Sequence, residues 1–589
     1  MPRTNLFFLL LLLCSFFPVA GAAPTHLVSE YPVSVMRHDS GIIIVDFGRV
    51  AFANVRLLPP ESAAGEITVH FGEAFANGRV NRNPPGTVRY NHAKARLDGE
   101  TPVLVAPPAD SRNTEYLSDK HPPAILTHPE WGVVIPFRWL EIEGWQGELL
   151  PEQVIRQSAF ARDWDDSASA FESSDAMLNQ IWELSRYSIK ATTFAGVYVD
   201  GDRERIPYEA DAYLNQLSHY ATDNDLQMAR DTFDHLMQHG TWPTEWASHM
   251  VFMAYADWMQ TGDLQWLAPR YEALKSKLLL ERLGKDGLIT SSRQQIRRAD
   301  IVDWPRKERD GYVFTGVNTV VNAFYLRAMK QMIELAHAVG NRADVESFGD
   351  MVGASHKAFQ QSLFMTKPGL YRDGVGTNHS SLHANLFPLA FGLVPAENRH
   401  HIVEWLVKRG MQCSVYAAQY LLEGLFEYGA GGEALELMTA PGDRSWRHMV
   451  ESGATITWEA WDMKYKPNQD WNHAWGAAPA NLLPRFVLGA QPLKPGWEAA
   501  RIRPTPGKLE YAKGKIPTPR GPVFIDWNNG DTFTLALTLP PGMNAKVELP
   551  ARHASGIVLV DGERIDATRS GDYWVLPGEF SGTVLLEVK

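Results

Sequence analysis

The densest group of charged side chains lies in residues 200–211, where five carboxylates and two guanidiniums occur within twelve residues. Apolar segments flank this stretch on both sides, so we expect its charges to line a cleft. Arginine neighbours would keep some of these acids ionised, whereas an apolar wall would keep another protonated. An acid/base pair needs such a difference between two carboxyl groups. The alternative is the start of a surface helix, where acids interact favourably with the helix dipole.

A second acidic group lies about 250 residues further on. Glu459 stands between Trp458 and Trp461, and His473 follows fourteen residues later. Two carboxyl groups on opposite sides of the scissile bond are the machinery of glycoside hydrolysis, and tryptophan rings stack on the apolar faces of sugars. The alternative is a half-buried acid that caps a helix beside packing aromatics.

Further tryptophans lie near acids between these two groups. Trp242 and the pair Asp303-Trp304 fall in expected loops between helices, where barrel enzymes place their sites. They are candidates for sugar contacts, with ordinary packing as the alternative in each case.

The hydrophobic periodicity divides the chain into three regions. Residues 25–168 contain short alternating or apolar runs separated by Gly, Pro and Asn, which is typical of a β-sandwich. Residues 169–492 follow a helical period, and residues 493–589 return to the β pattern. The middle region could form a helical bundle, a solenoid or an (α/α) barrel. We find no fixed repeat, which disfavours the solenoid.

Within the middle region, a helix is expected to begin near Leu178. Amphipathic segments follow at 208–238, 246–261, 264–282, 317–339, 342–363, 399–409, 414–428 and 432–439. Stop signals occur at Gly262-Asp263, Gly340-Asn341, Gly410 and Gly429.

The N-terminus has the pattern of a secretory signal peptide. Arg3 precedes a short apolar run, and small residues near Ala22 suggest cleavage there. We therefore expect residues 1–22 to be removed and the protein to be secreted or periplasmic, with no membrane contact after cleavage. Cys14 and Cys413 are the only cysteines, which excludes a disulfide framework and a metal site built on thiolates.

Composition excludes other classes of protein. The chain has 589 residues, 45% of them hydrophobic, which is enough for a large core and for several domains. A net charge of −12 argues against nucleic acid as a partner, because phosphate binding needs a basic surface. The sequence contains no metalloprotease, serine-hydrolase or P-loop motif. We therefore expect neither a cofactor nor a metal.

The two acidic groups resemble motifs of the α-L-rhamnosidases of glycoside hydrolase family 78. That family carries a motif of the form D-x-x-x-R-D-E-R-x-x-W-x-x-D, which residues 200–211 resemble, and a later motif G-A-T-T-x-W-E-x-W-D, which residues 453–462 resemble. Asn472-His473 is similar to a further family motif. Three departures concern the first motif: it is two residues shorter before the acid, Asp202-Arg203 replaces Arg-Asp, and Tyr208 replaces Trp.

This resemblance implies a multidomain fold, with an (α/α)6-barrel catalytic domain flanked by N-terminal and C-terminal β-sandwich domains. It implies an exported, inverting α-L-rhamnosidase in which Glu204 is the general acid and Glu459 the general base. With the loop residues noted above, the candidate substrate-binding residues are Asp200, Asp202, Arg203, Tyr208, Asp211, Trp242, Asp303, Trp304, Trp458 and His473.

The implied partner is a rhamnose-containing oligosaccharide, polysaccharide or glycoside. A flavonoid glycoside, a pectic or ulvan-type glycan and a rhamnose linked to glucuronate all remain open. So do two other functions: an (α/α)-barrel enzyme acting on a different sugar as a hydrolase or a polysaccharide lyase, and a non-catalytic carbohydrate-binding protein.

Overall fold

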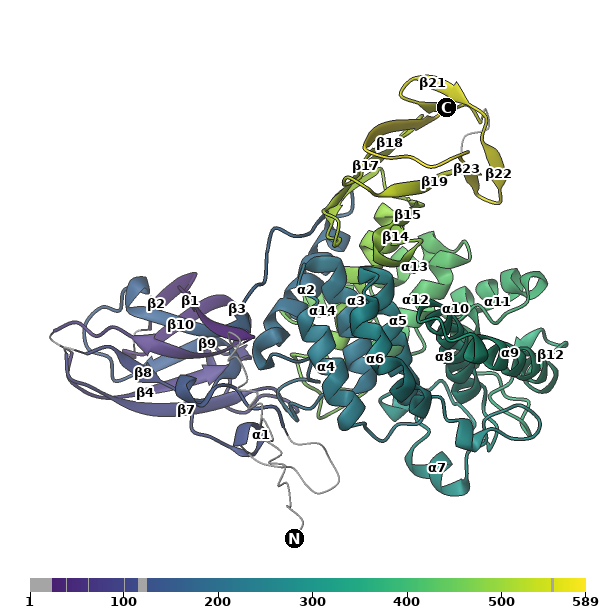
Figure 1. Cartoon of the computed structure of the whole chain (residues 1–589). Coiled ribbons are helices and arrows are strands. Elements are labelled where there is room, and N and C mark those ends of the chain that lie inside the picture. The colour runs from purple at the N-terminus through teal and green to yellow at the C-terminus, as the bar shows by residue number, and fades with distance from the viewer. Residues whose placement is uncertain (1–23, 39, 62, 100, 115–123, 552–555) are drawn as a thin grey trace, which may run out of the picture.

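Two β domains contact different sides of a helical domain in the computed structural model (Figure 1). The structure describes residues 24–589 except 39, 62, 100, 115–123 and 552–555. The predicted signal peptide, residues 1–22, lies outside the described residues. Among the residues that are described, no helix has both the length and the apolar character needed to cross a membrane.

The N-terminal β domain is organised around one long strand, β3 (Ile43–Leu57), which pairs with four others. Its register shifts between Asp46 and Ala51, and such a bulge bends and twists a strand. The sheet order is β1-β10-β3-β9-β4-β7, with β2 and β8 also paired to β3. These strands are β1 (Thr25–Glu30), β2 (Ser34–Arg37), β4 (Gly65–Gly72), β7 (Tyr90–Leu97), β8 (Val103–Val105), β9 (Ile135–Glu143) and β10 (Val154–Ala161).

The helical domain is an (α/α)6 barrel, as the family resemblance implied. In the described part of the chain, six helices contact one another in a closed inner ring: α3 (Glu209–Thr222), α5 (His249–Thr261), α8 (Thr319–Ala338), α10 (His383–Ala390), α12 (Val415–Glu427) and α15 (Ala478–Leu482). The outer helices are α2 (Ala176–Ala191), α4 (Gln227–Gln238), α6 (Leu264–Leu274), α9 (Arg342–Leu363), α11 (Ala396–Arg409) and α13 (Gly431–Met438).

Side-chain caps fix where several of these helices begin. Asp263 accepts hydrogen bonds from the backbone N–H groups of Gln265 and Trp266 at the start of α6. Asn318 and Ser414 cap α8 and α12 in the same way. Each cap satisfies amides that the first helical turn leaves unpaired. The stop signals are confirmed, since helices end just before Gly262, Gly340, Gly410 and Gly429.

Several predictions about the helices were wrong. The segment 264–282 is an α-helix only as far as Leu274, and the inner helix α15 was missed. Residues 208–238 form two helices, α3 and α4, because the chain turns at residues 223–226. α10 was missed, although its eight residues lie in the inner ring. It is buried on nearly every side, so it lacks the polar face that makes an amphipathic helix visible in a sequence.

The C-terminal β domain consists of two sheets. One has the order β11-β16-β17-β18-β24-β20-β21, the other β14-β15-β19-β23-β22. Its buried side chains belong to the same hydrophobic core as the barrel, whereas most of the N-terminal sheet has a separate core. The strands are β14 (Ala490–Pro492), β15 (Ala499–Ile502), β16 (Tyr511–Ile516), β17 (Val523–Asn529), β18 (Phe533–Thr538), β19 (Asn544–Pro550), β20 (Val558–Val560), β21 (Glu563–Ile565), β22 (Thr568–Ser570), β23 (Tyr573–Val575) and β24 (Thr583–Val588).

One strand joins a sheet that is remote in sequence. β11 (Ala170–Ser173) precedes the first barrel helix, yet it pairs antiparallel with β16 of the C-terminal domain. The region predicted to be helical from residue 169 therefore starts with a strand of the C-terminal sheet.

Candidate active site

A cavity of about 220 Å³ lies among the loops at one end of the barrel. We call it the acid cavity, because four carboxylic acids line it. Nine of the twelve sequence candidates meet there: Asp200, Arg203, Glu204, Tyr208, Asp211, Trp242, Trp304, Glu459 and His473.

Hydrogen bonds within the acidic loop before α3 fix its conformation. The Asp200 N–H donates to the Ile206 carbonyl over 2.9 Å, and the Ile206 N–H donates to Asp200 Oδ1 over 3.0 Å. Arg205 has a φ of 55°, and its buried guanidinium donates to Asp202 Oδ1 over 2.7 Å. Glu204 therefore lies in this tight loop rather than on a helix, since α3 begins only at Glu209.

Glu204 is the more accessible of the two predicted catalytic acids, with 31% of its side chain exposed. The Tyr208 hydroxyl donates a hydrogen bond of 2.8 Å to Glu204 Oε2, and Arg203 Nε lies 3.3 Å from Oε1. Asp200 is buried nearby. Burial, followed by the negative charge of Glu204, raises the pKa of Asp200 well above its ordinary value.

Glu459 is buried and bound to two cations. Arg203 donates to both of its carboxylate oxygens, over 2.8 and 3.0 Å, and Lys466 Nζ lies 3.1 Å from Oε1. Burial alone would raise the pKa of Glu459. The charges of Arg203, His473 and Lys466 outweigh burial and lower this pKa to about 2. Glu459 is therefore a carboxylate over the whole physiological pH range.

Arg203 also limits the distance between the two carboxyl groups, because one guanidinium contacts both. Neighbouring guanidinium nitrogens are about 2.3 Å apart. Glu204 Oε1 and Glu459 Oε2 therefore lie no more than roughly 8.4 Å apart. The cavity thus brings together two acids that are 255 positions apart in the chain.

Asp211 and His473 form a second contact across the cavity. His473 Nε2 lies 2.7 Å from Asp211 Oδ1, and both side chains are almost fully buried. Burial raises the pKa of Asp211 despite the opposing effect of His473. This pair can position a sugar hydroxyl, since between them the two groups offer a donor and an acceptor.

The structure does not bring three of the sequence candidates into the acid cavity. Asp202 is fully buried behind it, in ion pairs with arginines. Asp303 is fully buried too, bound to His383 and Ser414. Trp458 stacks on Trp471 at a centroid distance of 5.4 Å and lines a different cavity. Asp202 and Asp303 therefore do not face the same cavity as Glu204, because their carboxylates are bound within the protein interior. Trp458 does not face it either, because its ring lines the other cavity.

Sequence reasoning missed several neighbours. Trp246, Ile301 and Trp475 complete the cavity wall. Asp470 accepts a hydrogen bond of 3.1 Å from the Arg203 N–H, and Lys466 binds Glu459 as described above. Trp246 lies four residues after Trp242, and Trp475 lies two residues after His473, so their proximity to predicted site residues is a signal that could have identified them. Nothing in the sequence indicates the contact between Lys466 and Glu459.

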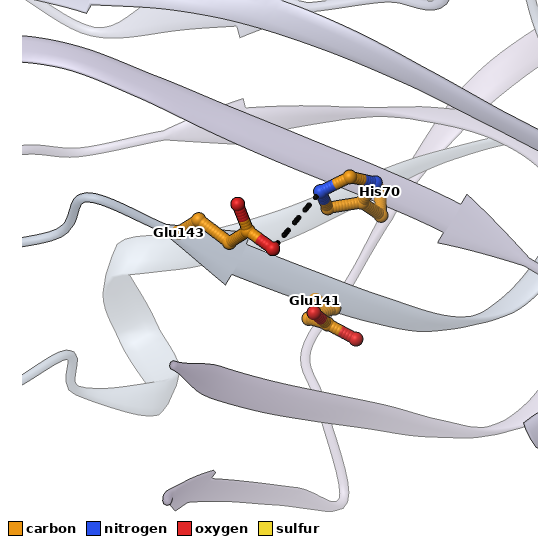
Figure 2. A group of neighbouring side chains, drawn as sticks. All are labelled: His70, Glu141 and Glu143. Carbon is orange, nitrogen blue, oxygen red and sulfur yellow. Dashed lines mark ion pairs between the residues drawn. The ribbon is translucent and has the colours of Figure 1, made fainter. Parts of the chain in front are cut away.

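Outside the cavity, His70, Glu141 and Glu143 lie close together on β4 and β9 (Figure 2). Glu141 accepts hydrogen bonds from both Arg79 and Arg82, and the same arginines bind Glu143. These two cations already balance the carboxylates, so the geometry gives no reason to place a metal there. Asp200, Asp470 and His473 also lie close together, and two of them, Asp200 and His473, line the acid cavity. The Arg203 guanidinium lies 3.9 Å from Asp200.

An (α/α)6 barrel whose loops hold opposed carboxyl groups in a tryptophan-lined cavity belongs to the class of barrel glycosidases. The family comparison agrees. Residues 166–487 match the bacterial alpha-L-rhamnosidase 6 hairpin glycosidase domain, and residues 489–564 match the bacterial alpha-L-rhamnosidase C-terminal domain. The chain therefore belongs to the bacterial α-L-rhamnosidase family of glycoside hydrolases, family 78.

Curated relatives are distant and longer. An alpha-L-rhamnosidase of Alteromonas sp. is 23% identical over 89% of this chain and 57% of its own length. One from Formosa agariphila is 22% identical over 72% of this chain and 48% of its own length. The chain thus spans about half the length of the curated relatives it matches.

Solved structures share the fold. The alpha-L-rhamnosidase of Dictyoglumus thermophilum superimposes with a TM-score of 0.79 at 17% identity, covering 95% of this chain and 63% of that one. The Streptomyces avermitilis alpha-L-rhamnosidase complexed with L-rhamnose gives 0.77 at 18% identity, covering 96% and 54%. This likeness covers both β domains as well as the barrel.

Proposed function

We propose that this protein is an inverting α-L-rhamnosidase that releases terminal L-rhamnose from a glycan or glycoside. The observation that carries the proposal is the pair Glu204 and Glu459, which Arg203 bridges within the acid cavity. Because both acids contact one guanidinium, their oxygens lie within roughly 8.4 Å of each other, close enough for both to act on one glycosidic bond. The inverting course of the reaction is taken from the family resemblance and is tested below. The family membership supports rhamnose as the sugar.

In this mechanism Glu204 donates its proton to the leaving glycosidic oxygen. Its partial exposure suits contact with the departing group. Glu459 accepts a proton from the water that attacks the opposite face of the sugar ring, and its low pKa keeps it ionised for that role. Asp211 and His473 would hold sugar hydroxyls, while Trp246 and Trp475 would pack against the apolar face of rhamnose.

The test compares wild type with Glu204→Gln and Glu459→Gln on two α-L-rhamnosides, one with a sugar and one with dinitrophenol as leaving group. Glu459→Gln should lower kcat by about a thousandfold on both, because both reactions need an activated water. Glu204→Gln should lower kcat by a similar factor only on the substrate with a sugar leaving group, because dinitrophenolate leaves without protonation. Glu183→Gln, at an exposed glutamate, is the control.

A separate experiment determines the anomeric configuration of the released rhamnose. Proton NMR during the first turnovers should show β-L-rhamnose, the inverted product, before mutarotation. Initial α-L-rhamnose would contradict inversion, and absence of any released rhamnose would show that the sugar is misassigned. Sugar binding without hydrolysis, equal in all variants, would indicate a binding protein instead.

We also propose that the protein is exported by the N-terminal segment, residues 1–22, whose pattern is that of a signal peptide. Expression in a bacterial host should yield an extracytoplasmic protein, and its measured mass should match a chain that begins near Ala23. A cytoplasmic protein that keeps Met1 would contradict export.

A further inference from the structure

A second cavity adjoins the acid cavity and differs from it in charge. Its volume is about 390 Å³, and it shares Trp242, Ile301 and Trp304 with the acid cavity. We call it the basic cavity, because four arginines line it: Arg297, Arg298, Arg306 and Arg309. Two of them come from α7 (Arg293–Arg298), on a loop that extends from the helical domain (Figure 1).

These arginines lack anionic partners. In the part of the chain that the structure describes, none of the four forms an ion pair with a carboxylate, and no side-chain hydrogen bond involves Arg298 or Arg306. Arg297 and Arg309 donate only to backbone carbonyls, those of Arg293 and Asp303. Elsewhere the protein pairs its arginines closely, as in Arg230 with Asp257 and Arg485 with Glu423.

Asp300 also lines the basic cavity, but it does not neutralise the positive charges of the four arginines. Asp300 is 4% exposed, and it accepts a hydrogen bond of 3.2 Å from Asn318 and lies 3.7 Å from Arg282. Its carboxylate therefore interacts with Asn318 and Arg282, although the residue lines the cavity. Arg309 is partly buried, and burial lowers its pKa even though the negative charges of the buried acids Asp303 and Glu245 oppose this effect. Neither of these acids, both in the described part of the chain, forms an ion pair with Arg309 within 4 Å.

Four like charges around one cavity repel each other, and the chain as a whole is acidic, with a net charge of −12. A bound anion would remove this repulsion. Guanidinium groups form paired hydrogen bonds with carboxylates and with sulfate or phosphate oxygens. Trp242, 44% exposed, adds a flat apolar face of the kind on which a sugar ring stacks.

We propose that the basic cavity binds the sugar residue on the leaving side of the scissile bond, and that this residue carries a negative charge. The proposal rests on the rhamnosidase function proposed above. If rhamnose binds in the acid cavity, the sugar attached to it extends past the shared wall into the basic cavity. The chemistry recognised is an oxyanion on a sugar ring, either the carboxylate of a uronic acid or a sulfate ester.

The experiment uses matched disaccharides that differ only in this group: α-L-rhamnosyl-D-glucuronate, α-L-rhamnosyl-D-glucose and α-L-rhamnosyl-D-glucose 6-sulfate. We expect wild type to prefer the charged substrates in kcat/KM by about 10- to 100-fold, the range of one or two charge-assisted hydrogen bonds. The relative kcat/KM values for the uronate and the sulfate identify which of the two anionic groups, carboxylate or sulfate ester, the cavity binds better.

The variant Arg298→Gln/Arg306→Gln removes two exposed charges that make no contact needed for folding. The ratio of kcat/KM for charged over neutral disaccharide should fall towards one, mainly through KM. Arg293→Gln, on the same helix but outside the cavity wall, is the matched control and should keep the wild-type ratio. Equal melting temperatures would verify that all variants are folded.

The outcomes separate the two proposals. Rhamnose release from an aryl rhamnoside without preference for the charged disaccharides, or with a preference that the double variant retains, would overturn the basic cavity as a subsite and leave the rhamnosidase intact. No rhamnose release from any substrate would overturn both.

Discussion

Arg203 occupies the position where the family motif has an aspartate, and it contacts both predicted catalytic acids. Its guanidinium binds Glu459 through two hydrogen bonds and lies 3.3 Å from Glu204. A carboxylate with a pKa of about 2 is always ionised but is a weak base. Arg203 therefore keeps Glu459 ionised at low pH but makes its carboxylate a weaker base. Substrate must displace part of this ion pair if Glu459 is to accept a proton.

Replacing Arg203 with glutamine should raise the pKa of Glu459, because burial is then opposed by Lys466 and His473 alone. Activity needs ionised Glu459, so the acidic limb of the kcat/KM profile should move to higher pH. Arg203→Lys keeps the charge and should leave the limb close to its wild-type position. A limb that does not move in Arg203→Gln would show that Glu459 does not determine it.

The junction between the barrel and the C-terminal domain depends on the end of one helical segment. After α15 the chain continues in a π-helical turn, Leu483–Leu488, and ends at Gly489 with a φ of 91°. A Cβ there would lie 2.3 Å from the carbonyl carbon of Arg503 and 2.4 Å from Pro504 N. Both neighbours are backbone, so they cannot move aside as a side chain could.

Gly489→Ala should therefore lower the free energy of unfolding by about 3 kcal/mol or more, from the left-handed conformation and the clash together. Gly340→Ala is the control, since Gly340 has a φ of 77° but no atom within 4 Å of an added Cβ. It should cost about 1 kcal/mol. Thermal unfolding measures both, and equal losses would contradict the clash.

The N-terminal domain reaches behind the acid cavity and contributes to its support. Its Arg89 and Arg112 lie 3.3 and 3.2 Å from Asp202 Oδ2. Burial would raise the pKa of Asp202, but these two arginines and Arg205 lower it to about 2. Glu73 of the same domain accepts a hydrogen bond of 2.9 Å from Asn472, beside His473. The barrel site is therefore completed by another domain.

Asp202→Asn should destabilise the protein by about 3–5 kcal/mol at neutral pH, since it leaves buried guanidiniums without a counter-charge. The folded-state pKa of Asp202 is lower than its ordinary value of 3.8, so its ionised form stabilises the fold above that pH. This contribution falls as the pH drops from 3.8 towards 2.

The measurement is chemical unfolding of wild type and Asp202→Asn at neutral pH and near pH 2.5. The difference between them should shrink at the lower pH. Asp531→Asn, at an exposed position of the C-terminal domain, should match wild type at both. A difference that is the same at both pH values would contradict the ion-pair explanation.

Local patterns were enough to predict the order of the domains and much of the barrel. Hydrophobic periodicity and capping depend on neighbouring residues, and they predicted helix ends such as those at Gly262 and Gly410. The resemblance added the (α/α)6 fold and both candidate acids, because their motifs are short and contiguous. α10 and the pairing of β11 with β16 could not be predicted in this way, since one lacks a polar face and the other joins segments about 340 residues apart.

The amino-acid sequence by itself therefore determined the succession of elements and which short segments carry acids and aromatics. Only the tertiary structure decided which of those side chains meet. Asp303 and Glu459 are both buried acids beside tryptophans, yet only Glu459 reaches the acid cavity. The same holds for the contact of Arg203 with Glu459, 256 positions apart, and for the arginines of the basic cavity. The physical reason is that burial, charge and pKa depend on the distances between atoms, and chain folding sets these distances between segments remote in sequence.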